Sequence, residues 1–394
     1  MQLIKNGLVH TMVKTPFVGD VLMADGKIVS VGENLSAENA EVFDATDCYV
    51  FPGFIDAHCH IGMWEDGMGD EGADGNECSD PLTPQLYAVD GLNPFDPCFQ
   101  EACAAGITCA VTGPGSANVI GGRFAAVKTH GRCLDDMLLK NPVAMKAAVG
   151  ENPKRVYGDQ KATPYTRMAI ASLFRKAMQT AIEYRDAKKL AESDPDKKPD
   201  LDLASEALLP VLCGELPMKI HAHRADDILT ALRLAREYGI HVTIDHCTEG
   251  YLITDVLKEQ IESIGAGVIL GPLISERSKI EVKNLSMRAP AVMEKAGIPF
   301  AMMTDHPVIP IQYLPLCCAM AVREGLSEEA AFAAITVNAA RIVGISDRVG
   351  TLEKGKDGDV AVFNGHPFDY KAHCVRTYIN GEVVFCADGQ PTSR

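Results

Sequence analysis

The chain contains 394 residues, of which 53 are Asp or Glu and 37 are Lys or Arg, so its formal net charge is −16. This acidic balance argues against nucleic acid as a partner, because nucleic-acid binding depends on basic surfaces that neutralise phosphates. A hydrophobic content of 47% with 23% charged residues is typical of a globular protein with a sizeable core.

The negative charge is concentrated in one part of the chain. Residues 28–122 contain sixteen Asp and Glu and no Lys or Arg, whereas the rest of the chain contains 37 acidic and 37 basic residues. Such a stretch produces a negative surface field wherever the fold places it. Its location therefore bears on which ligands the protein attracts.

The thirteen cysteines show no regular spacing and no C-x-x-C pair, which favours a reducing compartment over a disulfide framework or a zinc ribbon. The first residues lack the apolar core and the cleavage site of a signal peptide. The longest uncharged run, residues 102–122, contains several Gly and a Pro and is a poor membrane span. We therefore predict a cytoplasmic protein that has no membrane-spanning segment.

Both ends of the chain are rich in predicted strands. Short alternating segments within residues 1–50 are separated by turn pairs such as Asn6-Gly7, a pattern typical of β-hairpins. The last fifty residues repeat that pattern, with strands divided by Gly-rich turns. We therefore predict one small β-sandwich domain composed of residues 1–50 and 345–394, and a second domain composed of residues 51–344.

The middle of the chain alternates compact apolar runs, typical of buried strands, with helical patterns. Residues 226–239 show the apolar spacing, acidic first turn and closing Gly of a helix. This alternation predicts an α/β fold, best closed as a TIM-type (β/α)8 barrel, with a doubly wound open sheet as the alternative. The charged residues 186–202 are predicted to form an exposed connection. The apolar runs are IDAHCH, GITCAVTG, MKAAVG, MKIHAH, HVTIDH, AGVILG and PFAMMTDH.

Two histidine pairs stand at the ends of predicted strands. His58 and His60 end the run FPGFIDAHCH, and His221 and His223 end the run MKIHAH. Because alternate residues of a strand point to the same side, each pair presents two imidazoles on one face. Imidazole is a preferred ligand of Zn²⁺ and neighbouring transition metals, so this spacing predicts a metal site. The alternative for either pair alone is two incidental strand histidines.

His246 and Asp305 occupy the same kind of position at the ends of two further apolar runs. The carboxyl ends of all strands in a barrel lie on one face, where active sites are found. Buried polar groups need partners, and a metal ion supplies them. We therefore expect these side chains to converge with the histidine pairs on one metal site.

These motifs give the chain a resemblance to the amidohydrolase superfamily of metal-dependent hydrolases. PGFIDAHCH resembles the first barrel strand of the family, and AGIT with GPGS resembles the second. MKIHAH, TIDHCTE and TDHP resemble strands five, six and eight, and GTLEKGKDGDVAVFNGHP resembles the return to the sandwich domain. The resemblance covers nearly the whole chain, is nearest to imidazolonepropionase and related amidohydrolases, and selects no single activity.

The resemblance implies a set of metal ligands. His58 and His60 correspond to the first pair, and His221 and His246 correspond to the remaining histidine ligands. His223 shares a face with His221 and is either the ligand in its place or a substrate contact. The implied cofactor is one or two divalent ions, with Zn²⁺ placed before Fe²⁺ and Mn²⁺.

The resemblance also implies hydrolysis of a C–N bond in a small molecule, such as an amide, a cyclic amide or an amidine. The metal activates water, Asp305 touches the metal and carries the proton, and His246 or His223 stabilises the developing negative charge. A homo-oligomer is a further expectation from the family. Two other functions are open on the same fold, namely a non-catalytic scaffold and a metal-dependent isomerase or decarboxylase.

Many members with two metal ions use a carboxylated Lys on strand four as a bridge, and no clear Lys stands on a fourth predicted strand. Glu151 follows an apolar run near the third-strand position, and a Glu bridge there resembles the arrangement in N-acetylglucosamine-6-phosphate deacetylase. The other interpretation is that Glu151 opens the following turn, because Asn152-Pro153 breaks the strand. In that case Lys146 is the next candidate, or the site holds a single ion.

Two groups of residues are predicted to contact the substrate. Asn118, Gly121 and Gly122 lie in GPGSANVIGG after the second strand, where free backbone N–H groups can bind anions, and a tight structural loop is the alternative. Basic side chains are candidates for pairing with a substrate carboxylate, or they are solvated surface charges. These basic candidates are Arg123, Lys128, Lys154 and Arg155.

The densest part of the acidic stretch, Glu65 to Asp80, contains seven acids and directly follows the first histidine pair. We therefore expect it on the active-site face. A negative field there would concentrate divalent cations or cationic substrates, unless basic residues across the rim neutralise it.

Overall fold

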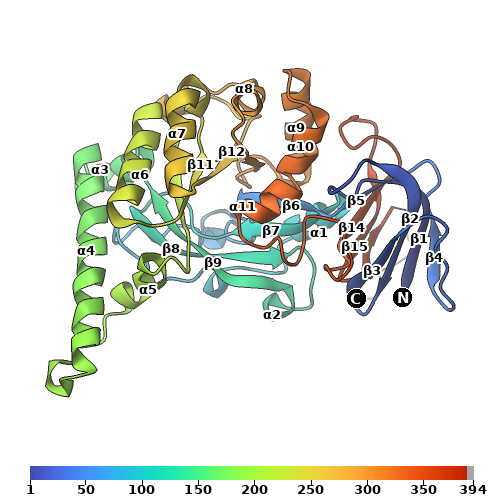
Figure 1. The fold of residues 1–394 in the computed structure, drawn as a ribbon. Coiled ribbons are helices and arrows are strands. Elements are labelled where there is room, and N and C mark those ends of the chain that lie inside the picture. Colours follow the sequence, from blue (N-terminus) through green and yellow to red (C-terminus); the bar gives the residue numbers. More distant parts are fainter. Residues whose placement is uncertain (388–394) are drawn as a thin grey trace.

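The computed structural model describes residues 1–387, which form two β-sheets with helices packed around one of them (Figure 1). The first sheet combines strands from the two ends of the chain, and the second is an eight-stranded barrel between them. The predicted α/β fold, a TIM-type barrel with a small β-sandwich domain, is confirmed. Residues 388–394, which the predicted composite domain includes, lie outside the described part of the chain.

The sandwich domain forms because strands from opposite ends of the sequence pair with each other. Its strands are β1 (Gln2–Val9), β2 (Phe17–Ala24), β3 (Lys27–Gly32), β4 (Glu41–Asp44), β5 (Tyr49–Pro52), β14 (Val360–Phe363), β15 (Cys374–Ile379) and β16 (Glu382–Cys386). β5 is antiparallel to β14, which joins the N-terminal and C-terminal strands into one sheet. Apolar side chains such as Ile4, Val21 and Val360 fill its core.

The barrel is nearly closed and contains one reversed strand. Its strands are β6 (Phe54–Cys59), β7 (Ile107–Thr112), β8 (Ile120–Lys128), β9 (Leu138–Ala148), β10 (Met218–Ala222), β11 (Val242–His246), β12 (Gly267–Leu270) and β13 (Ala301–Met302). Asp305 N donates to the His58 carbonyl oxygen (3.2 Å), which links the segment after β13 to β6. β8 is antiparallel to both β7 and β9, so β7 and β8 form a hairpin that the sequence pattern did not predict.

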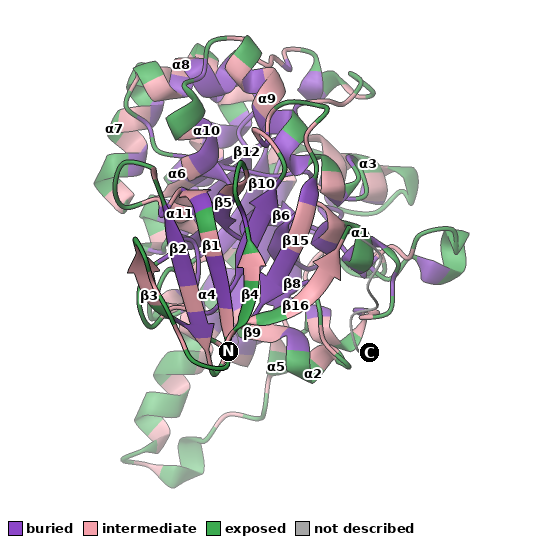
Figure 2. Ribbon diagram, turned by 90° about the vertical axis from the view of Figure 1, so that its right-hand side faces the viewer, coloured by how far each residue is buried: buried purple, intermediate pink, exposed green. Residues whose placement is uncertain are grey.

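Helices surround the barrel, and buried residues concentrate in the strands (Figure 2). The helices are α1 (Cys98–Ala104), α2 (Leu134–Met137), α3 (Glu151–Asp159), α4 (Arg167–Ala191), α5 (Leu203–Leu212), α6 (Ala225–Tyr238), α7 (Thr254–Ile264), α8 (Ala289–Lys295), α9 (Leu314–Arg323), α10 (Glu328–Ala334) and α11 (Val337–Ile342). The connection predicted at 186–202 begins only after α4 ends, because its first residues favour helix. Within residues 1–387, no helix is both long and apolar enough to cross a membrane.

A buried ion cluster joins the barrel to the sandwich domain. Lys128, at the end of β8, is 2% exposed, and its Nζ lies 2.9 Å from Asp357 Oδ2 and 2.5 Å from Asp359 Oδ2. Lys27 and Arg348 also contact Asp357, at 2.6 Å and 2.8 Å. The expectation that Lys128 is a substrate contact or a solvated charge is wrong, because the reversed β8 carries it to the opposite end of the barrel from the histidine pairs.

Replacing Lys128 with methionine is expected to lower the free energy of unfolding by about 3–5 kcal/mol, because it leaves two buried carboxylates without their shared partner. Urea denaturation followed by circular dichroism measures this change. Arg132→Ala is the control, because it removes an ion pair with Asp136 in which the Arg side chain is 87% exposed. Equal stability of Lys128→Met and the wild type would contradict the structural role of the cluster.

Candidate metal centre

Six side chains from four strands converge at the carboxyl end of the barrel. They are His58 on β6, His60 directly after β6, His221 on β10, His223 directly after β10, His246 on β11 and Asp305 shortly after β13. All five histidines are buried, with exposed fractions between 0 and 7%. The structure thus brings together every histidine and the aspartate that the strand-end pattern singled out.

One group of potential ligands comprises His58, His246 and Asp305. Asp305 Oδ1 lies 3.6 Å from His58 Nε2 and 3.2 Å from His60 Nε2. Ligand atoms about 2.0–2.2 Å from a tetrahedral ion lie about 3.4 Å from one another. These separations are therefore suited to ligands that share one ion.

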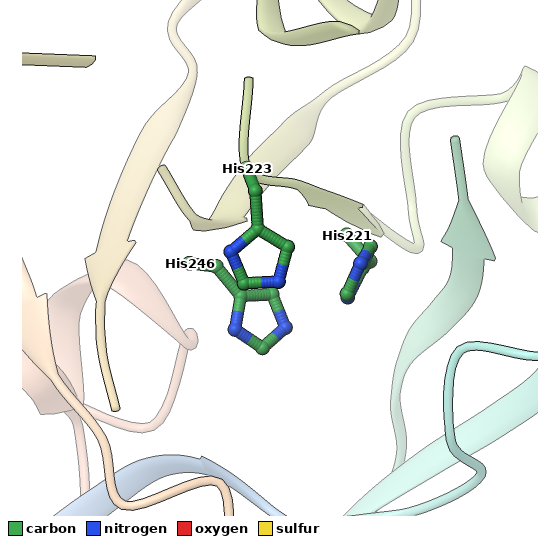
Figure 3. Close-up of side chains that lie close together, drawn as sticks. All are labelled: His221, His223 and His246. Carbon is green, nitrogen blue, oxygen red and sulfur yellow. The ribbon is translucent and has the colours of Figure 1, made fainter. Parts of the chain in front are cut away.

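A second group comprises His221, His223 and His246 (Figure 3). The rings of His223 and His246 are stacked with their centroids 4.4 Å apart, and the His221 ring lies 4.3 Å from that of His246. His246 belongs to both groups, so the two groups form one continuous site. This arrangement can accommodate one ion or two.

Two of these histidines are held by a hydrogen-bond acceptor at Nδ1, and a carboxylate lies close to Nδ1 of a third. Asp245 Oδ2 lies 2.9 Å from His58 Nδ1. Backbone carbonyl oxygens contact the other two, Gly113 with His60 at 2.7 Å and Gly271 with His246 at 3.0 Å. An acceptor there holds the proton on Nδ1 and leaves Nε2 with a free lone pair, which is the usual arrangement of histidines that bind metal.

The site contains buried nitrogen atoms that lack a hydrogen-bond partner among the described residues. They are both ring nitrogens of His58, His246 Nε2, His221 Nδ1 and Lys146 Nζ. Buried polar atoms are normally satisfied, and exceptions call for an explanation such as an ion. A divalent metal fits this donor set, because imidazole and carboxylate are ligands that Zn²⁺ and its neighbours accept.

Burial keeps the imidazoles neutral. It lowers the pKa of His58 to about 3, and it also lowers the pKa values of His221 and His246. Burial opposes the charged form of Asp305 too, but the neighbouring His60 and His58 outweigh it and lower the pKa of that carboxyl to about 2. Neutral imidazole and ionised carboxylate are the forms that bind a metal.

A left-handed backbone conformation orients the side chains of His246 and Asp305. The φ angles of His246 and Asp305 are 71° and 56°, a region that residues other than Gly rarely adopt. In a regular strand Asp245 and His246 would point to opposite sides. The turn at His246 lets Asp245 contact His58 while His246 also faces the site.

Lys146 lies on β9, which is the fourth barrel strand because β8 occupies the third position. The expectation that no Lys stands on a fourth strand is therefore wrong. Its Nζ is buried without a partner, whereas Nζ of Lys219, its register partner on β10, lies 3.2 Å from Asp245 Oδ2. Burial lowers the pKa of Lys146 to about 8, against the attraction of Asp245.

Glu151 is not placed as a bridge. It is the first residue of α3, its Oε2 accepts from Glu281 N (2.9 Å), and it belongs to neither ligand group. The interpretation in which it opens the segment after the strand is the one the structure supports. The carboxylate beside the histidines is Glu281, whose Oε1 lies 3.3 Å from His221 Nε2. Sequence reasoning missed Glu281, because it follows no apolar run.

The side chain of Asn118 is engaged in hydrogen bonds within the protein. Its side-chain amide donates to Glu77 O and to Thr83 Oγ1, both at 2.8 Å. Its Oδ1 accepts from the Tyr157 hydroxyl at 2.5 Å. Asn118 therefore fixes the loop to its neighbours, which agrees with the alternative of a tight structural loop.

Gly121 and Gly122 are part of strand β8 rather than of an open loop, and their contact with a substrate stays a prediction. Gly122 has a φ of 117°, and a Cβ there would lie 3.0 Å from the Leu86 carbonyl oxygen. A close approach of the chain around Leu86 therefore requires glycine at this position.

Three of the predicted basic contacts, Arg123, Lys154 and Arg155, stay predictions. The Arg123 guanidinium stacks on the Tyr87 ring at 3.9 Å, and its buried Nε has no partner among the described residues. Lys154 and Arg155 line a cavity of about 490 Å³ together with Glu151.

The acidic segment after β6 packs against the site. The Trp64 ring lies 5.1 Å from the His60 ring, and Asp66, Asp70 and Glu71 that follow are exposed. Lys128, one of the bases expected to neutralise them, is paired at the opposite end of the barrel. The exposed acids therefore follow directly after the residues that pack against His60.

The fold agrees with what comparison with known proteins shows. Residues 214–385 match a family model described as the amidohydrolase family. The chain belongs to this family of hydrolases, as its strand-end motifs predict. It is similar to the crystal structure of an amidohydrolase from Thermotoga maritima MSB8, with 44% identity, a TM-score of 0.95, and coverage of 98% of this chain and 100% of that one.

Two curated relatives are more distant. Amidohydrolase tasK of Hapsidospora irregularis is 28% identical over 94% of this chain, and the imidazolonepropionase of Thermoplasma volcanium is 29% identical over 43% of it. The matches span only 40% of the length of tasK and 42% of that of the imidazolonepropionase. Family membership is thus established, whereas the reaction and substrate of this chain are the subject of the proposal below.

Proposed function

We propose that this chain is a metal-dependent hydrolase that cleaves a C–N bond in a small molecule, such as an amide, a cyclic amide or an amidine. The observation that carries the proposal is the set of buried, unpartnered nitrogen atoms at the carboxyl end of the barrel, His58 Nε2, His246 Nε2 and His221 Nδ1. Leaving such atoms without partners is costly, and an ion between them removes that cost. Zn²⁺ is the ion we favour, with Fe²⁺ and Mn²⁺ as the alternatives.

Two sets of residues would hold ions. His58, His60 and Asp305 would bind the first, and His221 and His246 would bind the second. Lys146, carboxylated on Nζ, would bridge the two, whereas an unmodified Lys146 would accompany a single ion. When bound, the metal acts as a Lewis acid that activates water and polarises the scissile carbonyl or its equivalent.

The protein's own side chains would move the proton and stabilise charge. Asp305 is an ionised carboxylate beside His58 and His60, so it can accept a proton from water and return it to the leaving nitrogen. His223 donates to or accepts from Thr248 Oγ1 at 2.7 Å through Nδ1, which fixes its ring beside His246. From there His223 or His246 would stabilise the negative charge that develops on the substrate.

Groups on the rim would select the substrate. Arg123 and Lys154 offer positive charge to a carboxylate, and the exposed acids Asp66, Asp70 and Glu71 would attract divalent cations or a cationic substrate group. The protein would act on a small molecule in the cytoplasm, as the homo-oligomer expected from the family. None of its thirteen cysteines forms a disulfide, which is consistent with a reducing compartment.

Metal analysis combined with a substrate screen tests the proposal. The purified protein is expected to contain Zn²⁺, Fe²⁺ or Mn²⁺, to lose activity on chelation and to regain it when the ion is returned. The screen covers N-acyl amino acids, dipeptides and cyclic ureides, and it measures release of ammonia, an amine or a new carboxylate.

His58→Ala provides the matched metal measurement, because it removes one ligand and leaves the other strand ends unchanged. We expect its metal content to fall below that of the wild type. Full metal content in this variant would contradict the ligand assignment. A wild-type chain that binds none of the three ions would rule out the proposed function and favour a scaffold, and turnover without C–N cleavage would favour an isomerase or decarboxylase.

A further inference from the structure

Glu281 places a buried carboxylate against the outer side of the histidine cluster. It lies in a short 3-10 helix, Ile280–Val282, in the segment between β12 and α8, and is fully buried. Its Oε1 lies 3.3 Å from His221 Nε2 and 3.6 Å from His223 Nε2. Lys279 Nζ contacts the same oxygen at 2.7 Å, so the buried negative charge has a positive partner.

The other oxygen of Glu281 ties this segment to the start of α3. Glu281 Oε2 accepts from Glu151 N (3.0 Å), and Glu151 Oε2 accepts from Glu281 N (2.9 Å), so the two residues bind each other reciprocally. Lys279 also donates to Asn152 Oδ1 at 2.9 Å. Three hydrogen bonds therefore attach the segment after β12 to the first turn of α3, and we call this contact the latch.

Gly150 makes room for this latch. A Cβ at Gly150 would lie 3.1 Å from Glu281 Oε2 and 2.9 Å from Asp227 Oδ2, and the φ of Gly150 is 87°. Both the space and the backbone conformation therefore require glycine. The position of Glu281 beside the histidines therefore depends on two separate segments, the one after β12 and the one that begins α3.

The contact has a direct consequence for His221. When Nε2 carries the proton, it donates to Glu281, and Nδ1 is left with a free lone pair. Nδ1 of His221 is buried without a partner, whereas in His246 the unpartnered nitrogen is Nε2. His221 is thus turned the opposite way from His246, and its Nε2 faces Glu281 Oε1 at 3.3 Å, with Asn152 Nδ2 at 3.4 Å.

We infer that Glu281 is a positioning residue that fixes the tautomer and ring orientation of His221, so that docking of the segment after β12 onto α3 completes the metal centre. The inference rests on the proposed function, because it assigns His221 Nδ1 to the metal. The contact of Glu281 with His221 parallels that of Asp245 with His58, but Glu281 lies on a connecting segment and Asp245 lies on a barrel strand. Replacing a residue that hydrogen-bonds to a metal-binding histidine typically lowers metal affinity by about 10–100-fold.

The test measures Zn²⁺ affinity by competition with a chromophoric chelator, together with the visible spectrum of the Co²⁺-loaded protein. Glu281→Leu is expected to weaken Zn²⁺ binding by about 10–100-fold and to alter the Co²⁺ spectrum. Glu281→Gln is expected to lie between Leu and wild type, because its amide oxygen can still accept from His221. Glu276→Gln is the matched control, because Glu276 is exposed on the same segment.

The outcomes separate the inference from the proposed function. Wild-type Zn²⁺ affinity and an unchanged Co²⁺ spectrum in Glu281→Gln and Glu281→Leu would overturn the positioning role while leaving the metal centre in place. Loss of thermal stability in both variants without any change in affinity or spectrum would also overturn it, because that pattern describes a purely structural residue. A wild-type chain that binds neither ion would overturn the proposed function itself.

Discussion

Replacing Asp305 with asparagine is expected to lower kcat by about 10²–10⁴-fold on the best substrate of the screen, the range typical for loss of a general acid–base group. Asparagine keeps the size of the side chain but cannot accept the proton. The carboxylate stands at the centre of the site, with Oδ1 3.2 Å from His60 Nε2 and 3.6 Å from His58 Nε2. Steady-state kinetics at saturating metal measures the loss.

The interpretation depends on a folded variant. Asp305 also donates its backbone N–H to the His58 carbonyl oxygen, and this bond is retained in Asp305→Asn because it does not involve the side chain. Asp196→Asn, on the exposed connection between α4 and α5, provides a control that should keep full activity. Undiminished turnover of Asp305→Asn would exclude it as the proton carrier.

Replacing Lys146 with methionine is expected to reduce the metal content from about two ions per chain to about one, if a carboxylated lysine bridges the site. The amine is the buried lysine nitrogen that lacks a partner among residues 1–387, and it lies on the fourth barrel strand. Its pKa of about 8 leaves part of it as the neutral amine that reacts with CO2 near neutral pH. Metal analysis and native mass spectrometry measure the ion count and the added CO2.

The buried Lys219 provides a comparison, because its amine has hydrogen-bond partners. Lys219 Nζ donates to the Ala57 carbonyl oxygen and lies 3.2 Å from Asp245, so it is not free to react. Lys176→Met, at an exposed position on α4, is the control for the loss of one lysine. Equal metal content in Lys146→Met and wild type, with no added CO2 on the wild type, would show that the site holds its ions without this bridge.

Much of the site follows from local patterns in the sequence. His58 and His60, and His221 and His223, are spaced by two residues at the ends of apolar runs, and this spacing determines that each pair shares a face of its strand. The carboxyl ends of barrel strands meet on one face, so the fold class already placed these pairs together with His246 and Asp305. Pairing between the two chain ends was also predictable, because both carry short strands separated by turn residues.

Other residues took their places only through the tertiary structure. The reversed β8 moves Lys146 onto the fourth strand and sends Lys128 to the far end of the barrel, and no local pattern marks the reversal. Glu281 rather than Glu151 reaches the histidines, because the segment after β12 docks onto α3. Residue spacing reports which side of a strand faces inward, whereas contacts between distant loops depend on how the barrel closes and on which buried charges find a partner there.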